Sequence, residues 1–135
     1  RTPVLGPYLT RTFTDRILLS QLGRNMYDQE LLPRYRRLFR NQLRFRGTKQ
    51  AFLSSLEHMP LQTLAPVYRE VAAGSVPLLI FWGKEDQIIP FHVGQQMRSE
   101  LPGAKFHAIP EAGHIAHWEK PWIIHPLLLD FLKDH

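Results

Sequence analysis

The sequence of 135 residues contains no cysteine. This absence excludes disulfide bonds, thiolate metal sites and a cysteine nucleophile. No apolar run approaches the roughly 18 residues that a membrane-spanning helix needs, and the start at Arg1-Thr2-Pro3 does not resemble a signal peptide. We therefore expect no transmembrane segment. The lack of a signal peptide and the lack of cysteine together favour a cytoplasmic location.

The chain is also poor in acidic residues over its first part. Residues 1–50 hold 11 Lys and Arg against 3 Asp and Glu, whereas residues 51–135 hold 6 against 9. The densest basic stretch is Arg34–Arg46, which a nucleic acid or an anionic membrane could contact. Apolar residues recur within it at helical spacing, so the arginines are better interpreted as the solvated face of an amphipathic helix. A nucleic-acid partner is not expected.

The hydrophobic pattern changes near residue 75. Before it, apolar side chains recur every three or four residues, which predicts helices over about 28–45, after Thr48 and over 63–73. After it, the continuous apolar run Val76–Trp82 and the segment Lys105–Ile109 predict two buried parallel strands joined by a helix over 91–101. A last helix is predicted from Pro121 to Lys133.

Two parallel strands cannot by themselves cover both faces of a sheet. The run Val76–Trp82 would therefore need neighbouring strands that these residues do not supply. The chain also begins without Met. We interpret the sequence as an α/β chain whose sheet is incomplete on its own, and as a piece of something longer.

Polar residues follow both predicted strands. Gly83-Lys84-Glu85-Asp86 comes after the first, and Glu111-Ala112-Gly113-His114 comes after the second. The carboxyl ends of neighbouring parallel strands are where open α/β sheets place their active sites. Asp86 could then accept the Nδ1–H of His114, which would leave Nε2 as a general base.

These motifs resemble the end of an α/β-hydrolase. The pattern is strand–Gly-x-x-Asp-x-x-x-Pro, about two dozen residues, then strand–Pro-x-x-Gly-His with Glu and Pro a few residues on. The resemblance implies that Asp86 is the triad acid and His114 the triad base, and the order of acid before histidine agrees with it. It covers residues 64–135 as the C-terminal part of the fold, and residues 1–63 resemble the helical cap of many members.

The resemblance implies an enzyme that needs no cofactor or metal and hydrolyses a small, apolar carboxylic ester. The chain departs from the family in lacking the Gly-x-Ser-x-Gly elbow, because none of its serines has the flanking glycines. The nucleophile would then lie on an N-terminal segment or on a partner chain. An epoxide hydrolase, dehalogenase, C–C hydrolase or cofactor-free peroxidase has the same end motifs, and a truncated, non-catalytic interaction module is a further alternative.

Other roles stay open for the individual residues. Asp86 could cap the helix that follows Pro90, and Glu85 could replace it as the acid. His114 could be a loop histidine bonded to backbone. His117 lies three residues further on, but no third ligand in the sequence pattern accompanies the pair, so a metal site is not expected.

Overall fold

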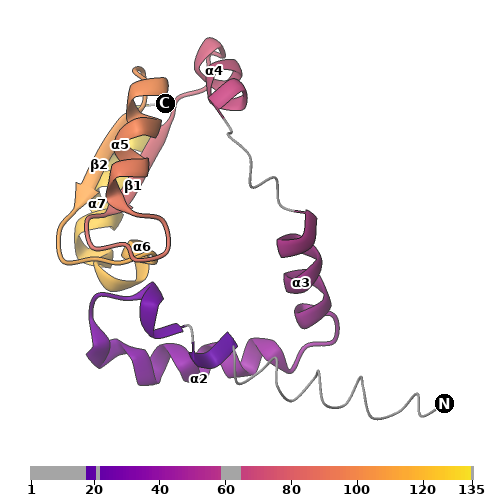
Figure 1. Ribbon diagram of the computed structural model, residues 1–135. Helices are drawn as coiled ribbons and strands as arrows, with labels where there is room; N and C mark the ends of the chain where they lie inside the picture. Colours follow the sequence, from indigo (N-terminus) through magenta and orange to yellow (C-terminus); the bar gives the residue numbers. More distant parts are fainter. Residues whose placement is uncertain (1–17, 21, 59–64, 135) are drawn as a thin grey trace. The chain divides into compact units, whose positions relative to one another are not determined.

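A computed structural model describes residues 18–20, 22–58 and 65–134 (Figure 1). The chain divides into two compact units. The first takes its described residues from Arg1–Gly23 and Glu30–Met59, and the second from Arg24–Gln29 and Pro60–His135. The short stretch Arg24–Gln29 therefore belongs with the C-terminal unit, although both of its flanks belong to the other.

The first unit is helical in its described part. Residues 18–20 are helical, and two longer helices follow, α2 (Leu32–Leu43) and α3 (Thr48–His58). The sequence predicted one helix over about 28–45, but α2 is shorter and begins beside Pro33, which fits a first turn because its missing N–H would have no partner there. Gly47 has a φ of +92° in the turn between the two helices.

The second unit contains the sheet. Its strands β1 (Leu79–Gly83) and β2 (Lys105–Ile109) are parallel, with Leu79 opposite Lys105 and Gly83 opposite Ile109. The helices of this unit are α4 (Ala65–Ala73), α5 (Phe91–Glu100), α6 (Ala116–Glu119) and α7 (Pro121–Lys133). Two short 3-10 segments, η1 (Leu22–Asn25) and η2 (Gln29–Leu31), lie where the chain passes between the two units.

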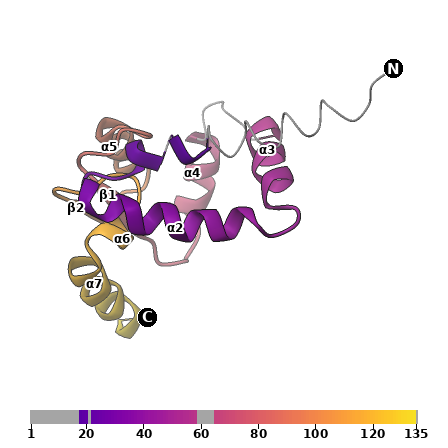
Figure 2. The ribbon, with the colours of Figure 1, turned by 90° about the horizontal axis from the view of Figure 1, so that it is seen from below.

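Helices cover both faces of the two-stranded sheet. Figures 1 and 2 show α5 on one face and α7 on the other. The buried core lies under α7 and the loop after β2, and half-buried Phe81 of β1 packs against it. Its members are Ile109, Ala112, Ala116 and Ile124. The core thus fixes the loop after β2, not only the strands.

Strand β1 starts later than its apolar run predicts. Pro77 has no N–H to donate to a neighbouring strand, and Val76 beside it is 70% exposed. The prediction of a strand over 76–82 is therefore wrong at its start. The residues of β1 before Gly83 are half-buried, as expected when only one neighbouring strand is present in the described part of the chain.

Helix α7 runs from Pro121 to Lys133 with Pro126 inside it. A proline at that position has no N–H, so the helix lacks one main-chain hydrogen bond there. In the part of the chain that the structure describes, no helix has both the length and the apolar character to cross a membrane.

Candidate active site

Main-chain hydrogen bonds connect the loop after β1 with the end of β2 and the loop that follows it. The N–H of Lys84 donates to the carbonyl of Ile109 at 2.9 Å, and the N–H of Glu85 donates to the carbonyl of Ala112 at 3.0 Å. A Cβ on Gly83 would lie 2.1 Å from the carbonyl oxygen of Gly113. Only glycine at position 83 lets the two loops lie this close together.

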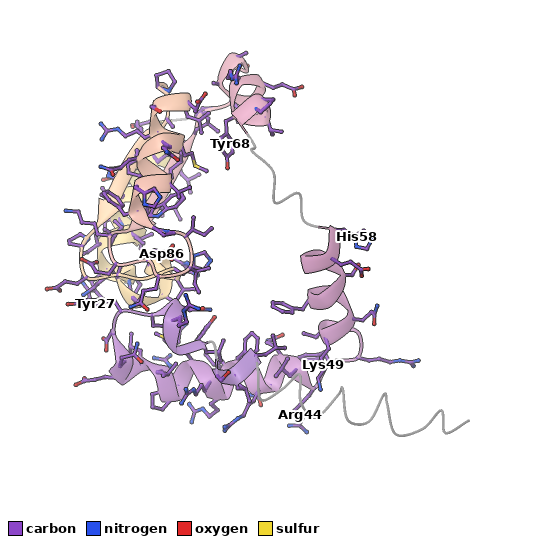
Figure 3. The ribbon with its side chains drawn as sticks, viewed as in Figure 1. Tyr27, Arg44, Lys49, His58, Tyr68 and Asp86 are labelled. Atoms are coloured by element: carbon purple, nitrogen blue, oxygen red, sulfur yellow. The ribbon has the colours of Figure 1, made fainter. Side chains whose placement is uncertain are left out.

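Asp86 lies in the loop after β1 (Figure 3), and its two oxygens have separate partners. Oδ1 accepts the N–H groups of Ile88 and Ile89 at 2.8 and 2.9 Å. Oδ2 lies 2.9 Å from Nδ1 of His114. The side chain is only 5% exposed, so one oxygen holds the loop that precedes α5 while the other faces the imidazole.

His114 follows Gly113 in the loop after β2, and its side chain is 36% exposed. Because a carboxylate only accepts hydrogen bonds, the contact with Asp86 assigns the proton to Nδ1. The unprotonated Nε2 is then the nitrogen available as a base. Among the described residues, Asp86 is the hydrogen-bond partner that the structure gives this side chain.

Asp86 and the alternative acid, Glu85, have different hydrogen-bond partners, and only Asp86 contacts the imidazole of His114. The Glu85 carboxylate accepts the N–H of Ala112 at 3.0 Å and so holds the backbone of the histidine loop. The capping role considered for Asp86 is present as well, through Ile88 and Ile89, and it coexists with the contact to the imidazole. His117 is exposed on α6. Within the described ranges, no three His, Asp or Glu residues are grouped as metal ligands would be.

Glu119 is the residue that the sequence analysis missed. It belongs to α6 and is 1% exposed. Its Oε1 accepts the N–H of Gly113 at 2.7 Å, and its Oε2 accepts the N–H groups of Tyr27 and Asp28 at 2.7 and 2.8 Å. Its spacing from His114 and its place before Pro121 were visible in the sequence, but two of its three donors, the N–H groups of Tyr27 and Asp28, lie about 90 residues earlier.

The segment Asn25–Asp28 contacts the histidine loop in two further ways. The N–H of Ile115 donates to the carbonyl of Asn25 at 3.3 Å. A Cβ on Gly113 would lie within 3.0 Å of three main-chain atoms of residues 25–27. Both neighbours of His114 in the chain are therefore bonded to Glu119 or to this segment.

The sequence pattern of the alpha/beta hydrolase fold family matches residues 12–121. The chain belongs to the alpha/beta hydrolase fold family. Two curated relatives and one solved structure illustrate the likeness. The chain is 26% identical over 136 residues to the uncharacterized hydrolase YugF of Bacillus subtilis, covering 97% of this chain and 47% of that protein. It is also 36% identical over 94 residues to the 2-hydroxy-6-oxononadienedioate/2-hydroxy-6-oxononatrienedioate hydrolase of Paraburkholderia phymatum. That match covers 68% of this chain and 32% of that protein.

The solved structure is Rv0554 from Mycobacterium tuberculosis, with a TM-score of 0.46 and 19% identity over 93% of this chain and 52% of that one. This alpha/beta hydrolase fold chain thus spans less than half the length of the two curated relatives. A mostly helical chain with two parallel strands agrees with part of the family's fold. The parallel strands and the family membership confirm the fold predicted from the sequence.

The basic stretch Arg34–Arg46 lies mainly on α2. Its arginines are exposed apart from half-buried Arg36, and Leu32 at the start of the helix is buried. This arrangement is typical of an amphipathic helix. The membrane and nucleic-acid alternatives rest on the charge alone.

We predict that the full-length protein binds duplex DNA only weakly. Fluorescence anisotropy with a random 20-base-pair duplex should give a Kd no tighter than the roughly 10⁻⁴ to 10⁻⁶ M of non-specific binding at physiological salt. A nanomolar Kd that weakens steeply between 50 and 200 mM salt, and that the double variant R37Q/R40Q abolishes, would contradict this prediction.

Proposed function

We propose that this chain supplies the general base, His114, and the orienting acid, Asp86, of a hydrolase that attacks a carbonyl carbon. The observation that carries the proposal is the 2.9 Å contact between Nδ1 of His114 and Oδ2 of Asp86. Family membership supports it, since a hydroxyl nucleophile followed by acid and histidine is the chain order of the fold. The nucleophile is proposed to lie outside these 135 residues.

The proposed reaction passes two protons through His114, one in each half of the cycle. Nε2 of His114 accepts the proton of the nucleophile hydroxyl as its oxygen bonds to the carbonyl carbon. The resulting imidazolium, held by Asp86, gives that proton to the leaving group as the bond to the carbonyl carbon breaks. Nε2 then takes a proton from water as the water oxygen bonds to the carbonyl carbon, and returns it to the nucleophile oxygen as the bond between that oxygen and the carbonyl carbon breaks and the acid is released. The Asp86 carboxylate stays ionised throughout.

The proposed substrate is a carboxylic ester with an apolar acyl group. This choice depends on a second proposal, that residues 1–63 form the helical cap. Large apolar side chains of the described helices in that range are exposed, among them Leu38 at 43% and Phe52 at 40%. Exposed apolar side chains of this kind would suit an apolar substrate better than a charged one.

One observation favours a second reaction. The Paraburkholderia phymatum relative is named for a substrate with ketone, hydroxyl and carboxylate groups and no ester. Hydrolysis of such a compound breaks a carbon–carbon bond beside the ketone. The same acid–base pair could serve it, because a hydroxyl or a water would still have to lose a proton near the carbonyl carbon.

The two reactions can be separated with the purified full-length protein. We expect hydrolysis of a p-nitrophenyl ester series, acetate to octanoate, with kcat/KM reaching about 10⁴ M⁻¹s⁻¹ for the best chain length. A 2-hydroxy-6-oxo-dienedioate, followed by its absorbance, tests the second reaction. Faster turnover of the keto acid by tenfold or more would replace the ester proposal with C–C hydrolysis. Turnover of neither would overturn both and favour the non-catalytic interaction module.

A further inference from the structure

The carboxylate of Glu119 joins two parts of the second unit that are distant in sequence. On one side it holds the N–H of Gly113, the residue immediately before His114. On the other side it holds the N–H groups of Tyr27 and Asp28 (Tyr27 is labelled in Figure 3). A carboxylate that is 1% exposed needs such donors, because burial without them costs far more than the hydrogen bonds return.

The histidine loop is thereby held on both sides of His114. Gly113 is bonded to Glu119, and Ile115 is bonded to the carbonyl of Asn25. The 2.9 Å contact between His114 and Asp86 lies between these two fixed points. A shift of the backbone at Gly113 would therefore be transmitted to the imidazole.

We propose that Glu119 is the positioning residue for His114, and that it sets the imidazole by fastening the histidine loop to the segment Asn25–Asp28. The inference rests on the proposed function for its effect on turnover, but its effect on the His114–Asp86 contact is independent of the reaction. Glu119 touches no reacting atom in this scheme, so it acts on catalysis only through the loop.

The geometry explains why the side chain must be a carboxylate. Three N–H donors converge on two oxygens, one on Oε1 and two on Oε2. A glutamine has one acceptor oxygen, and its NH₂ group would face an N–H donor wherever the oxygen is placed. Turning the oxygen toward Tyr27 and Asp28 satisfies two donors and leaves the N–H of Gly113 without an acceptor. The unsatisfied N–H group would then lie on the residue directly before His114.

The test compares Glu119→Gln with Glu111→Gln in the full-length protein. Glu111 lies in the same loop, its side chain is 69% exposed, and its carboxylate lies 3.3 Å from Nζ of Lys120 at the surface, so the chemical change is matched. We expect E119Q to lower kcat about 10- to 100-fold while KM changes less than about threefold, because misplacing a catalytic group by about an ångström costs roughly that much. E111Q should retain wild-type kcat.

A spectroscopic readout separates positioning from a general loss of stability. The Nδ1 proton of His114, bonded to Asp86, should give a downfield proton NMR resonance that E111Q keeps and E119Q loses or broadens. This result supports the proposal even if the protein turns over none of the substrates above, in which case only the proposed function fails. A wild-type resonance together with wild-type kcat in E119Q would overturn it.

Glu119→Asp covers the case in which E119Q does not fold. It keeps the charge but is one methylene shorter, so it cannot reach both Gly113 and Tyr27 without a backbone shift. We expect a folded protein with an intermediate loss of kcat and a shifted Nδ1 resonance. If E119Q and E119D both fail to fold, Glu119 acts on stability alone and the positioning role is rejected.

Discussion

Asp86→Asn in the full-length protein is expected to lower turnover of its best substrate by about 10³-fold or more, with a smaller change in KM. The amide can still place its oxygen on the N–H groups of Ile88 and Ile89. Its NH₂ group then faces Nδ1 of His114 and donates to it. The imidazole would carry its proton on Nε2, where a base is needed, and could no longer accept one from the nucleophile.

His114→Ala should produce a loss of the same size, and the double variant should be no worse than either single one, since the two residues act as a unit. Asp130→Asn and His117→Ala are the matched controls. The Asp130 side chain is 72% exposed, and His117 is exposed three residues after His114. Stopped-flow or steady-state assays would measure the effect. Turnover that survives in either D86N or H114A would remove that residue from the proposed site.

Gly83→Ala is expected to separate the two loops of the site. The added Cβ would lie 2.1 Å from the carbonyl oxygen of Gly113 and 2.3 Å from that of Ala112, far inside contact distance. Both obstacles are backbone, so the loops must move apart. Overpacking of this kind costs about 1–3 kcal/mol of unfolding free energy, and the displaced His114 should lower kcat about 100-fold.

Gly103→Ala is the control for this change, because a Cβ there meets no atom within 4 Å. Thermal unfolding of both variants beside the kinetics tells the two effects apart. A G83A protein with the melting temperature and kcat of the wild type would show that the loops do not need their close approach.

The sequence was sufficient to predict the Asp86–His114 contact because its determinants are local. Each residue follows an apolar strand by a few positions, and parallel strands bring their carboxyl ends together. Helix α5 and strand β2 were predicted for the same reason, with Pro90 before the helix and Lys105–Ile109 a short β-prone run. The roles of the two residues remain predictions.

Two features were not predicted correctly: the burial of Glu119 and the start of β1. Glu119 is an acidic residue in a short helix, where a charged side chain normally faces solvent. Its burial depends on N–H groups donated from Tyr27 and Asp28, about 90 residues earlier. The start of β1 was predicted too early because the prediction followed the apolar run from Val76 and did not take Pro77 into account. Pro77 has no N–H to donate to a neighbouring strand, so strand pairing begins after it.

The way the chain divides into units has a consequence for protein engineering. Arg24–Gln29 is sequence from the middle of the helical part, but it packs as a piece of the sheet-bearing unit. Its main chain binds the carboxylate and the loop beside His114. A chimaera that exchanges the helical unit for another should therefore place its junctions on either side of residues 24–29 and keep these six. A grafted segment that follows another backbone path in place of residues 24–29 would leave the Glu119 carboxylate without the N–H groups of Tyr27 and Asp28 and would loosen the histidine loop.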